Sequence, residues 1–472
     1  MVAQATKDAS TKSSTCAPTI HERDAAFDVE ASETWEDVET LEGDGVRGWV
    51  MVSFSGRDEL RACSENSFAF NLDRLSRRSI DKRFAVFRQR PDNSAPLFLY
   101  PYHLRMTRMA RTSATSKKLR MAFIGAGGIA KAHLDALKNF DDVEVVALAD
   151  VSQKTLEDRA QEYDLPSDGL FTDYKKMLKV VQPDAVNICT PNGLHAPNAI
   201  ASSKAGAHVI VEKPMGMNAA ECKRMIAVAK AAKKKLVIGF QYRFDPKTEF
   251  LTRLRDDGVF GDIRFARVQA LRRRGIPNWG VFGRKELQGG GPLIDIGVHV
   301  LEMCHFTMGS PKPVAALGMT DTYLGNKPSN KIASRWAGWD HKTYTVEDLA
   351  VGHIRFENGA VIHLESSFAA HHEHNGKMDF QIMGTKGGAK WDTSEVFTDQ
   401  NGHMMNLTPA WLPEKEGGFA GYFGLKLRNF VDHITKGTPS LAPAEHGLMV
   451  QQMLDAVYAS ADKGGKEVLI KA

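Results

Sequence analysis

The stretch LRMAFIGAGGIA, residues 119–130, decides the fold. Its first six residues are mostly apolar, as expected of a short strand that is buried on both faces of a parallel sheet. Gly125 permits a tight turn after this strand, and Gly127 allows the backbone to approach a pyrophosphate closely. Apolar residues recur at helical spacing from Ile129 onward, and the N-terminus of a helix attracts phosphate charge. The stretch therefore predicts a strand, a turn and a helix that bind a dinucleotide through Gly125, Gly127, Gly128 and Ile129.

A second predicted strand, residues 143–149, ends at Asp150. An acid at this distance from the glycine turn can accept hydrogen bonds from the adenosine ribose hydroxyls, and its charge repels a 2′-phosphate. The nearest cation that follows it is Lys154. The pattern predicts NAD as the cofactor and disfavours NADP.

The composition excludes several classes of protein. A chain of 472 residues is too long for one core and suggests two or three domains. A net charge of +4, with 25% charged residues, gives no reason to expect nucleic acid as a partner. The five cysteines show no disulfide or metal spacing, which fits a reducing cytoplasm. No apolar stretch is long enough to cross a bilayer, so we expect no membrane partner.

Residues 1–116 differ from the rest of the chain. Residues 21–46 are strongly acidic, residues 74–120 are rich in arginine, and residues 112–116 form a small polar run typical of a linker. Because neither block has sustained periodicity, we predict an extension that is disordered or foreign to the native protein. In the second case, the natural start would be Met106, Met109 or Met121.

Strands and helices alternate after Asp150, which is the pattern of a doubly wound parallel sheet. We assign a Rossmann domain to residues 117–240 and a second domain to residues 241–472. Two predicted strands end in polar motifs, TPNGLH at residues 190–195 and EKP at residues 212–214. Loops at the carboxyl ends of such strands are where open α/β sheets place ligands.

These two motifs, followed by GGGPLIDIGVH at residues 289–299, resemble the glucose–fructose oxidoreductase/inositol dehydrogenase (Gfo/Idh/MocA) family. The resemblance covers about residues 117–472. It implies an N-terminal Rossmann domain and a C-terminal α+β domain with a large, open, mostly antiparallel sheet. One face of that sheet usually builds an oligomer interface, so we expect a homo-oligomer, either a dimer or a tetramer.

The sequence supports the second domain independently of the resemblance. Residues 263–271 alternate around charged positions, as in a half-buried strand. Two further apolar segments, residues 349–356 and 360–368, flank Glu357-Asn358-Gly359, which is a hairpin signal. The fold class predicted for the whole chain is therefore α/β, with a parallel sheet followed by a mostly antiparallel one.

Three residues carry the predicted chemistry. Oxidation of a carbinol requires a base for the hydroxyl proton, and His299 is the best candidate because imidazole titrates near neutral pH. Asp295 precedes it by one helical turn and can orient the ring if both lie on one helical face. Lys213 emerges from a strand end and can bind the hydroxyl oxygen. The resemblance implies that Lys213, Asp295 and His299 are the catalytic set. Pro214 restricts the Lys213 backbone, and its peptide bond could be cis.

Weaker candidates surround this set. The resemblance suggests that Asn192 and His195 edge the nicotinamide pocket, although His195 could instead cap its helix. Tyr242 and Arg243 follow the last Rossmann strand and are expected to face the substrate, and Trp279 can stack on a polar ring. The predicted cofactor contacts outside the glycine turn are Asp150, Thr190, Asn192, His195, Glu212 and Lys213. The predicted substrate contacts are Tyr242, Arg243, Trp279, Asp295 and His299.

One run of histidines has the composition of a metal site but not its expected geometry. The run His371-His372-Glu373-His374 contains metal-ligand types, but adjacent residues on a strand point to opposite faces, so we predict no metal.

The sequence thus predicts a cytoplasmic, NAD-dependent dehydrogenase that acts on a secondary hydroxyl of a sugar, cyclitol or derivative. One alternative is a glycosidase that uses NAD transiently without net redox. Another is a non-catalytic NAD-binding regulator. Such a regulator would not need Lys213, Asp295 and His299, so their presence counts against it. Net NADH formation separates the dehydrogenase from the glycosidase.

Overall fold

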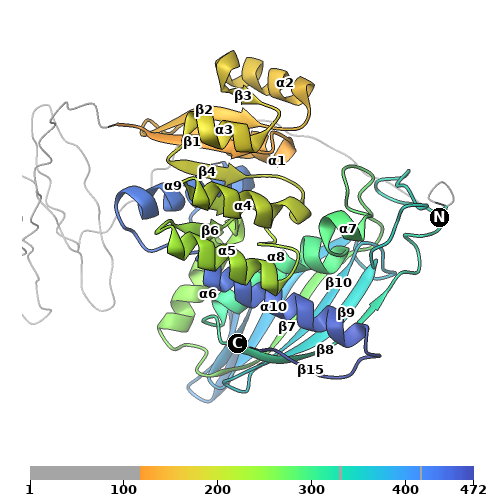
Figure 1. The fold of residues 1–472 in the computed structure, drawn as a ribbon. Coiled ribbons are helices and arrows are strands. Elements are labelled where there is room, and N and C mark those ends of the chain that lie inside the picture. The colour runs from red at the N-terminus through yellow and green to blue at the C-terminus, as the bar shows by residue number, and fades with distance from the viewer. Residues whose placement is uncertain (1–116, 329–331, 415–416, 472) are drawn as a thin grey trace, which may run out of the picture. The chain divides into compact units, whose positions relative to one another are not determined.

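A computed structural model describes residues 117–328, 332–414 and 417–471 (Figure 1). The prediction made for residues 1–116 lies outside the described residues. Within the described part, the strands form a six-stranded sheet and a nine-stranded sheet. The predicted fold class, a parallel α/β sheet followed by a mostly antiparallel one, is confirmed.

The first sheet is parallel throughout and has the strand order β3-β2-β1-β4-β5-β6. This is the Rossmann order, whose switch point lies between β1 and β4. Its apolar strands are buried, as the uninterrupted hydrophobic runs require. The strands are β1 (Leu119–Ile124), β2 (Val143–Ala149), β3 (Leu170–Phe171), β4 (Ala185–Ile188), β5 (His208–Val211) and β6 (Leu236–Ile238).

The helices of this half begin in two different ways. The side chains of Ser152, Asp173 and Asn218 accept hydrogen bonds from the first turns of α2, α3 and α5. By contrast, α1 begins after Gly127, which has no side chain to cap it. Free backbone N–H groups therefore remain at the start of α1. The helices are α1 (Gly128–Leu137), α2 (Gln153–Tyr163), α3 (Tyr174–Val181), α4 (His195–Lys204) and α5 (Ala219–Ala231).

The second sheet has the order β14-β13-β12-β11-β7-β10-β9-β8-β15. Its pairs are antiparallel except for β7 with β10. The predicted hairpin joins β9 to β10, and Gly359 adopts a φ of +81° there. The strands are β7 (Ile263–Arg272), β8 (Pro313–Asp321), β9 (Leu349–Phe356), β10 (Val361–Ser367), β11 (Gly376–Gly384), β12 (Gly387–Lys390), β13 (Glu395–Gln400), β14 (His403–Leu407) and β15 (Val468–Leu469).

Helix α8 (Val298–Thr307) packs on β7 and β11 and carries His299 in its first turn. It is preceded by a π-helical turn, Leu293–Gly297, which contains Asp295. The short turn η3 (Gln241–Phe244) follows β6. The other helices after β6 are α6 (Pro246–Asp256), α7 (Lys285–Gln288), α9 (Gly418–Thr435) and α10 (Ala444–Ala461).

The last two helices return to the first sheet. Helix α9 packs against α1, and α10 lies between α5 and β8 (Figure 1). Leu427 and Phe430 of α9 belong to the same buried cluster as Met121 and Phe123 of β1. The C-terminal part of the chain therefore completes the core around the dinucleotide-binding half.

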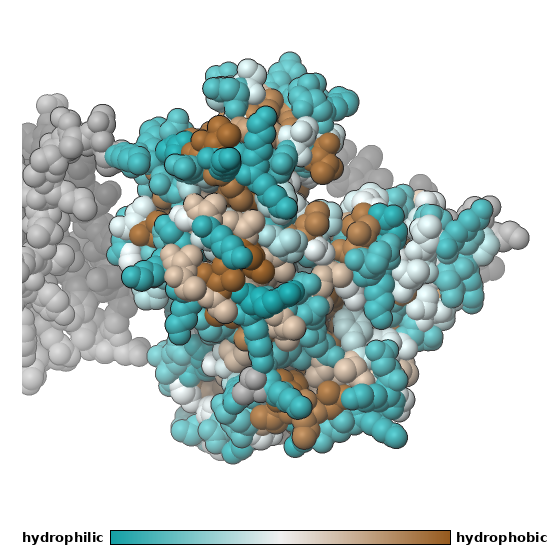
Figure 2. Space-filling view, in the orientation of Figure 1, coloured by the Kyte–Doolittle hydropathy of each residue, from teal (hydrophilic) through white to brown (hydrophobic). Residues whose placement is uncertain are grey.

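Figure 2 shows one face of the molecule in the orientation of Figure 1. Hydrophilic side chains cover most of it, and hydrophobic residues form separate patches among them. Scattered apolar patches of this kind are normal on folded domains. Across the described residues, every helix is too short or too polar to cross a membrane.

Candidate active site

The glycine turn has the geometry of a phosphate cradle. Gly125 has a φ of +90°, and a Cβ at this position would lie 2.6 Å from the main-chain oxygen of Cys189. The turn therefore needs glycine both for its conformation and for its approach to the end of β4. A Cβ at Gly127 or Gly128 would have no heavy atom within 4 Å. That open space lies beside the uncapped start of α1, and it fits the pyrophosphate of a dinucleotide.

Asp150 lies at the end of β2, beside this turn. Its Oδ2 accepts a hydrogen bond from the Ala126 backbone N–H at 2.8 Å, and its Oδ1 accepts one from Ser152 at 2.9 Å. The carboxylate is therefore fixed at the glycine turn, where the predicted ribose contact would be made.

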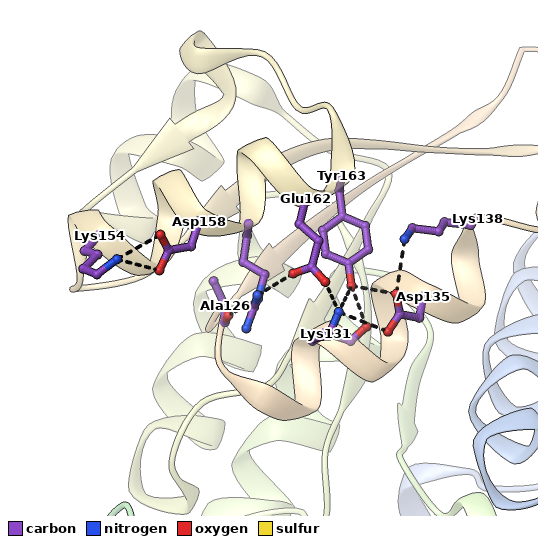
Figure 3. Close-up of polar contacts among 9 residues, drawn as sticks. Ala126, Lys131, Asp135, Lys138, Lys154, Asp158, Glu162 and Tyr163 are labelled. Atoms are coloured by element: carbon purple, nitrogen blue, oxygen red, sulfur yellow. Dashed lines mark hydrogen bonds and ion pairs between the residues drawn. The ribbon is translucent and has the colours of Figure 1, made fainter.

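The cations that follow Asp150 in the sequence are engaged by carboxylates. Lys154 bonds Asp158 at 3.0 Å, and Arg159 bonds both Glu162, at 2.6 Å, and the Ala126 main-chain oxygen, at 3.1 Å. Figure 3 shows the Lys154 ammonium directed at the Asp158 carboxylate. The local charges beside Asp150 therefore do not favour an additional phosphate.

A second set of contacts fastens α2 to α1 in the same region (Figure 3). The hydroxyl of Tyr163 donates to the Asp135 carboxylate at 2.8 Å, and Lys131 contacts Glu162. These contacts hold the two helices that flank the glycine turn.

Lys213 and Asp295 meet although 82 positions separate them in the sequence. The Lys213 Nζ donates to the Asp295 main-chain oxygen at 3.0 Å and to its Oδ1 at 3.1 Å. The two side chains are 18% and 14% exposed, so a ligand can reach both. The Lys213–Pro214 peptide bond is cis.

His299 lies beside this pair with a free ring nitrogen. Its Nδ1 is buried and has no hydrogen-bond partner among the described residues, and its ring meets Tyr242 edge-on at 5.3 Å between centroids. Burial, together with the charge of Lys213, holds the pKa of His299 well below its usual range. The ring is therefore neutral near pH 7.

The link between Asp295 and His299 differs from the one expected. The sequence analysis placed both residues on one α-helical face, with the carboxylate orienting the ring. The structure makes Leu293–Gly297 a π-helical turn, and the Asp295 carboxylate bonds Lys213 instead. This turn is held by Glu347, whose carboxylate accepts hydrogen bonds from the N–H groups of Gly291 and Leu293 at 2.8 and 3.2 Å.

Three of the predicted cofactor contacts bind protein groups. His195 is 1% exposed, with Nδ1 lying 2.7 Å from the Pro214 oxygen and Nε2 2.9 Å from the Thr190 oxygen. The ring thus joins the two strand-end loops rather than capping its helix. The Thr190 hydroxyl accepts a hydrogen bond from Asn198, and Asn192 donates to the Gln288 oxygen at 2.9 Å.

Glu212 was also predicted to contact the cofactor, but the structure turns its carboxylate into the interior. The residue is 5% exposed. Its Oε1 lies 2.6 Å from the Nζ of Lys426 and 3.0 Å from the Nε2 of His133. A buried carboxylate requires such partners because it has lost its water shell.

Tyr242 and Arg243, which follow β6, lie in different environments. Tyr242 lies beside His299, as expected of a residue that faces the substrate. Arg243 was predicted to do the same, but it is only 2% exposed. Its guanidinium bonds Glu302 at 2.7 Å and the Leu441 oxygen at 2.6 Å, so it lies in the core rather than in the pocket.

Trp279 contributes to an aromatic wall, which we define as Trp279, Trp336 and Arg272. Trp279 is 49% exposed, and its ring meets Trp336 edge-on at 4.8 Å. The Arg272 guanidinium lies over the Trp336 ring at 5.1 Å. Burial lowers the pKa of Arg272, and the negative charge of Asp295 opposes that shift. Arg272, one member of the aromatic wall, therefore interacts electrostatically with Asp295 of the Lys213–Asp295 pair.

Sequence reasoning missed two residues of this region. Lys426 occupies a position between Phe423 and Leu427 on the apolar stripe of α9, and a lysine on such a stripe is a detectable signal. Trp336 lies outside regular secondary structure, and no pattern in its segment distinguishes it. Within residues 117–328, 332–414 and 417–471, no group of three acidic, histidine or cysteine side chains could hold a metal.

A Rossmann sheet whose strand ends face a lysine, a carboxylate and a neutral histidine defines a class, the dinucleotide-dependent oxidoreductases. Residues 119–240 match the model of the oxidoreductase family's NAD-binding Rossmann fold, and residues 255–469 match that of its C-terminal alpha/beta domain. The chain belongs to the Gfo/Idh/MocA family of oxidoreductases.

Similar curated proteins act on sugars and cyclitols. D-glucoside 3-dehydrogenase of Escherichia coli is 34% identical over 355 residues, which are 75% of this chain and 98% of that protein. Myo-inositol 2-dehydrogenase of Thermotoga maritima is 26% identical over 70% of this chain and 92% of its own length.

Solved structures share the fold. A levoglucosan dehydrogenase in complex with NADH and levoglucosan superimposes with a TM-score of 0.65 at 24% identity. The match covers 75% of this chain and 100% of that one.

Proposed function

We propose that this protein is an NAD-dependent dehydrogenase that oxidises a secondary ring hydroxyl of a sugar, cyclitol or derivative, with glucosides as the first candidates. The observation that carries the proposal is the contact between Lys213 and Asp295, together with a neutral His299 whose Nδ1 has no partner within the part of the chain that the structure describes. The similarity to D-glucoside 3-dehydrogenase supports glucosides as the class to test first.

The three side chains divide the work of the reaction. Lys213 donates a hydrogen bond to the hydroxyl oxygen and stabilises negative charge that develops there. His299, which is neutral, accepts the hydroxyl proton. Asp295 keeps the Lys213 ammonium in place through its two oxygens. When bound, NAD supplies the acceptor for the hydride that leaves the carbinol carbon.

The cofactor-binding residues follow from the same geometry. The backbone around Gly127 and Gly128 would hold the pyrophosphate, since the start of α1 is open there. Asp150 would bind the adenosine ribose and select NAD over NADP. His195 and Asn192 would act indirectly, by holding the loops that border the nicotinamide.

The aromatic wall suggests how a glycoside would be held. Trp279 is 49% exposed and contacts Trp336, which in turn lies under Arg272, whose charge interacts with Asp295. Aromatic rings pack well against the apolar faces of sugars and of aryl groups. We therefore place the aglycone or second ring of a glucoside on Trp279, beyond the reacting sugar.

We also propose a cellular location, an oligomeric state and a set of partners for the protein. We expect a cytoplasmic homo-oligomer, a dimer or a tetramer, that binds no nucleic acid or membrane. Leu317 and Met319 of β8 are 38% and 48% exposed, so this strand presents apolar side chains that a second copy could cover. Light scattering after size-exclusion chromatography would measure the mass, and a monomer at micromolar concentration would contradict the oligomer.

The function is tested by NADH formation. Purified protein is assayed by NADH absorbance with glucosides, inositols and levoglucosan. We expect net NADH with glucosides, and a lower KM for a phenyl than for a methyl glucoside if Trp279 binds the aglycone. Sugar release from glycosides without net NADH would contradict the dehydrogenase. Equal KM values for the two glucosides would contradict the aromatic wall.

A further inference from the structure

A fully buried group of polar side chains lies behind Lys213. We call His133, Asn187, Glu212 and Lys426 the buried charge cluster; none of them is more than 5% exposed. They come from α1, β4, the end of β5 and α9. Burial of a lysine to this extent is rare, and it requires a partner because an isolated charge in the interior is costly.

The cluster is completely connected. The Lys426 Nζ donates to the Glu212 Oε1 at 2.6 Å, and Asn187 donates to the His133 Nδ1 at 2.7 Å. The His133 Nε2 lies 3.0 Å from the same Glu212 oxygen and 2.9 Å from the Lys426 Nζ, so the ring contacts both members of the ion pair. Burial and the charge of Lys426 lower the pKa of His133, so its ring is neutral. Burial alone would raise the pKa of Glu212, but Lys426 and His133 hold it well below its usual range.

The second oxygen of Glu212 leads to the active site. Its Oε2 accepts a hydrogen bond from the backbone N–H of Lys213 at 3.2 Å. The carboxylate occupies the space beside Gly239, where a Cβ would lie only 2.6 Å from Oε1, so any side chain at position 239 would displace it. Lys426 therefore holds a carboxylate that in turn holds the main chain of Lys213.

We propose that Lys426 is a positioning residue for the reaction: through Glu212 it fixes the backbone of Lys213, so that α9 supports the reacting groups from behind the sheet. The inference rests on the proposed function of Lys213. It adds a C-terminal helix to the machinery of a site whose other groups come from the strand ends and the π-helical turn.

The same helix offers a matched control. Arg428 of α9 makes a bidentate ion pair with Asp142, with both distances 2.8 Å, and it also fastens α9 to the first sheet. This pair is partly exposed and involves no residue of the buried charge cluster. If the buried charge cluster only anchors α9, loss of either cation should have the same kind of effect.

The test compares Lys426→Met and Arg428→Met in the full chain with NAD and a glucoside. We expect Lys426→Met to lower kcat by about 10- to 100-fold, the scale of a misplaced catalytic group, with the Kd for NAD changed less than about threefold. Arg428→Met should lower Tm but keep kcat within about twofold. Equal losses of kcat in the two variants, or normal turnover in Lys426→Met, would overturn the proposal.

A double variant covers the case in which Lys426→Met does not fold. Adding Glu212→Met removes the unpaired buried carboxylate and also the acceptor for the Lys213 N–H, so Tm should recover relative to Lys426→Met. The turnover should stay low, because Lys213 is still not held. Recovery of turnover together with Tm would reduce the cluster to a structural role and refute the inference.

A measurement without turnover separates this inference from the proposed function. Hydrogen exchange, followed by mass spectrometry on the segment around residues 212–217, should become faster in Lys426→Met and not in Arg428→Met. Absence of wild-type NADH formation would refute the proposed function while leaving this result interpretable. Unchanged exchange in Lys426→Met would refute the positioning role itself.

Discussion

Lys213 is held by two oxygens of a single residue, because its Nζ donates to both the main chain and the carboxylate of Asp295. An ammonium group has three hydrogens, so one remains for a ligand. A long side chain that would otherwise sample several rotamers is thus fixed before the substrate arrives. In the proposed reaction, this fixed positive charge lies ready for the oxygen on which negative charge develops.

Replacing Lys213 with methionine should therefore reduce turnover without loss of the cofactor. We expect Lys213→Met to lower kcat at least ~100-fold, the scale of a lost electrostatic stabiliser, with the Kd for NAD nearly unchanged. Steady-state kinetics and NAD titration measure the two quantities. Lys154→Met is the control, since that side chain is 83% exposed. Near-normal turnover in Lys213→Met would remove the residue from the mechanism.

Asp150 and its neighbour provide a test of cofactor selection. Val151 is 91% exposed beside Asp150, so an arginine there costs little packing. Asp150→Ser with Val151→Arg removes the carboxylate that repels a 2′-phosphate and adds a cation for it, while serine can still accept a hydrogen bond. We expect the ratio of kcat/KM for NAD to that for NADP to fall by at least ~10-fold. Faster reduction of NADP than of NAD by the wild type would contradict the role of Asp150.

His305 illustrates how a buried ring affects stability at low pH. Burial lowers its pKa to about 3, whereas the unfolded chain has a value near ~6.5. Below pH 6.5 the unfolded state therefore binds a proton that the folded state does not. The free energy of unfolding consequently decreases as the pH is lowered.

His305→Gln keeps a donor for the Pro311 oxygen, which the ring contacts at 2.8 Å. The wild type should lose about 2 kcal/mol relative to this variant between pH 6.5 and 5. Urea denaturation at several pH values measures the difference. Parallel pH profiles for the two proteins would be inconsistent with a neutral buried ring.

At the scale of elements, the glycine-rich approach to the π-helical turn is fixed by close packing. A Cβ at Gly291 would lie 2.0 Å from the Glu347 main-chain oxygen. Because the same segment leads to Asp295, any displacement is transmitted to the Lys213 contact. In α9, by contrast, a Cβ at Gly424 would meet only the Ala136 Cβ, at 3.9 Å.

The two glycines should respond in opposite ways to alanine. We expect Gly291→Ala to cost about 1–3 kcal/mol and most of the activity, since the backbone must shift. Gly424→Ala should be neutral or stabilise by up to about 1 kcal/mol, because alanine favours the helix. Thermal unfolding and kcat measure both effects. A stable, active Gly291→Ala protein would show that the turn tolerates displacement.

Elements governed by local pattern were predictable from the sequence, whereas long-range contacts were not. The strands Leu119–Ile124 and Val143–Ala149 have their predicted bounds, because their apolar runs and the residues that follow them fix them locally. The inward turn of Glu212 depends on Lys426, which lies 214 positions away, and no local pattern encodes that pair. Arg243 was misplaced for the same reason: its partner Glu302 comes from another helix.

The Asp295 contact shows an intermediate case. Spacing indicated Asp295 and His299 as candidates for the chemistry, but it assumed an ordinary helix. The π-helical turn changes the direction of the side chain, and it is held by Glu347 from a distant loop. A sequence can therefore name the reacting residues more readily than the contacts among them.

For the whole molecule, the described residues contain every group assigned to the site. We propose that residues 1–116 are dispensable and that residues 117–240 and 241–472 form the two domains of the enzyme. A chain that starts at Ser116 should keep its Tm and specific activity, because the extension lacks the apolar periodicity of a packed core. Calorimetry and the NADH assay on both lengths measure this. Insoluble or inactive protein, with the full chain active, would show that the extension is needed.

The return of α9 to the first sheet also affects the order of events during synthesis. The strand β1 ends at Ile124, whereas α9 begins at Gly418, near the end of the chain. Nascent domains generally fold as they emerge, from the N-terminal end. Here, the face of the first sheet that carries Met121 and Phe123 is covered only after Leu427 and Phe430 have been synthesised. The strands of the dinucleotide-binding half are therefore synthesised well before the helix that covers one face of their sheet. During that interval the sheet presents an apolar face that chaperones are suited to shield.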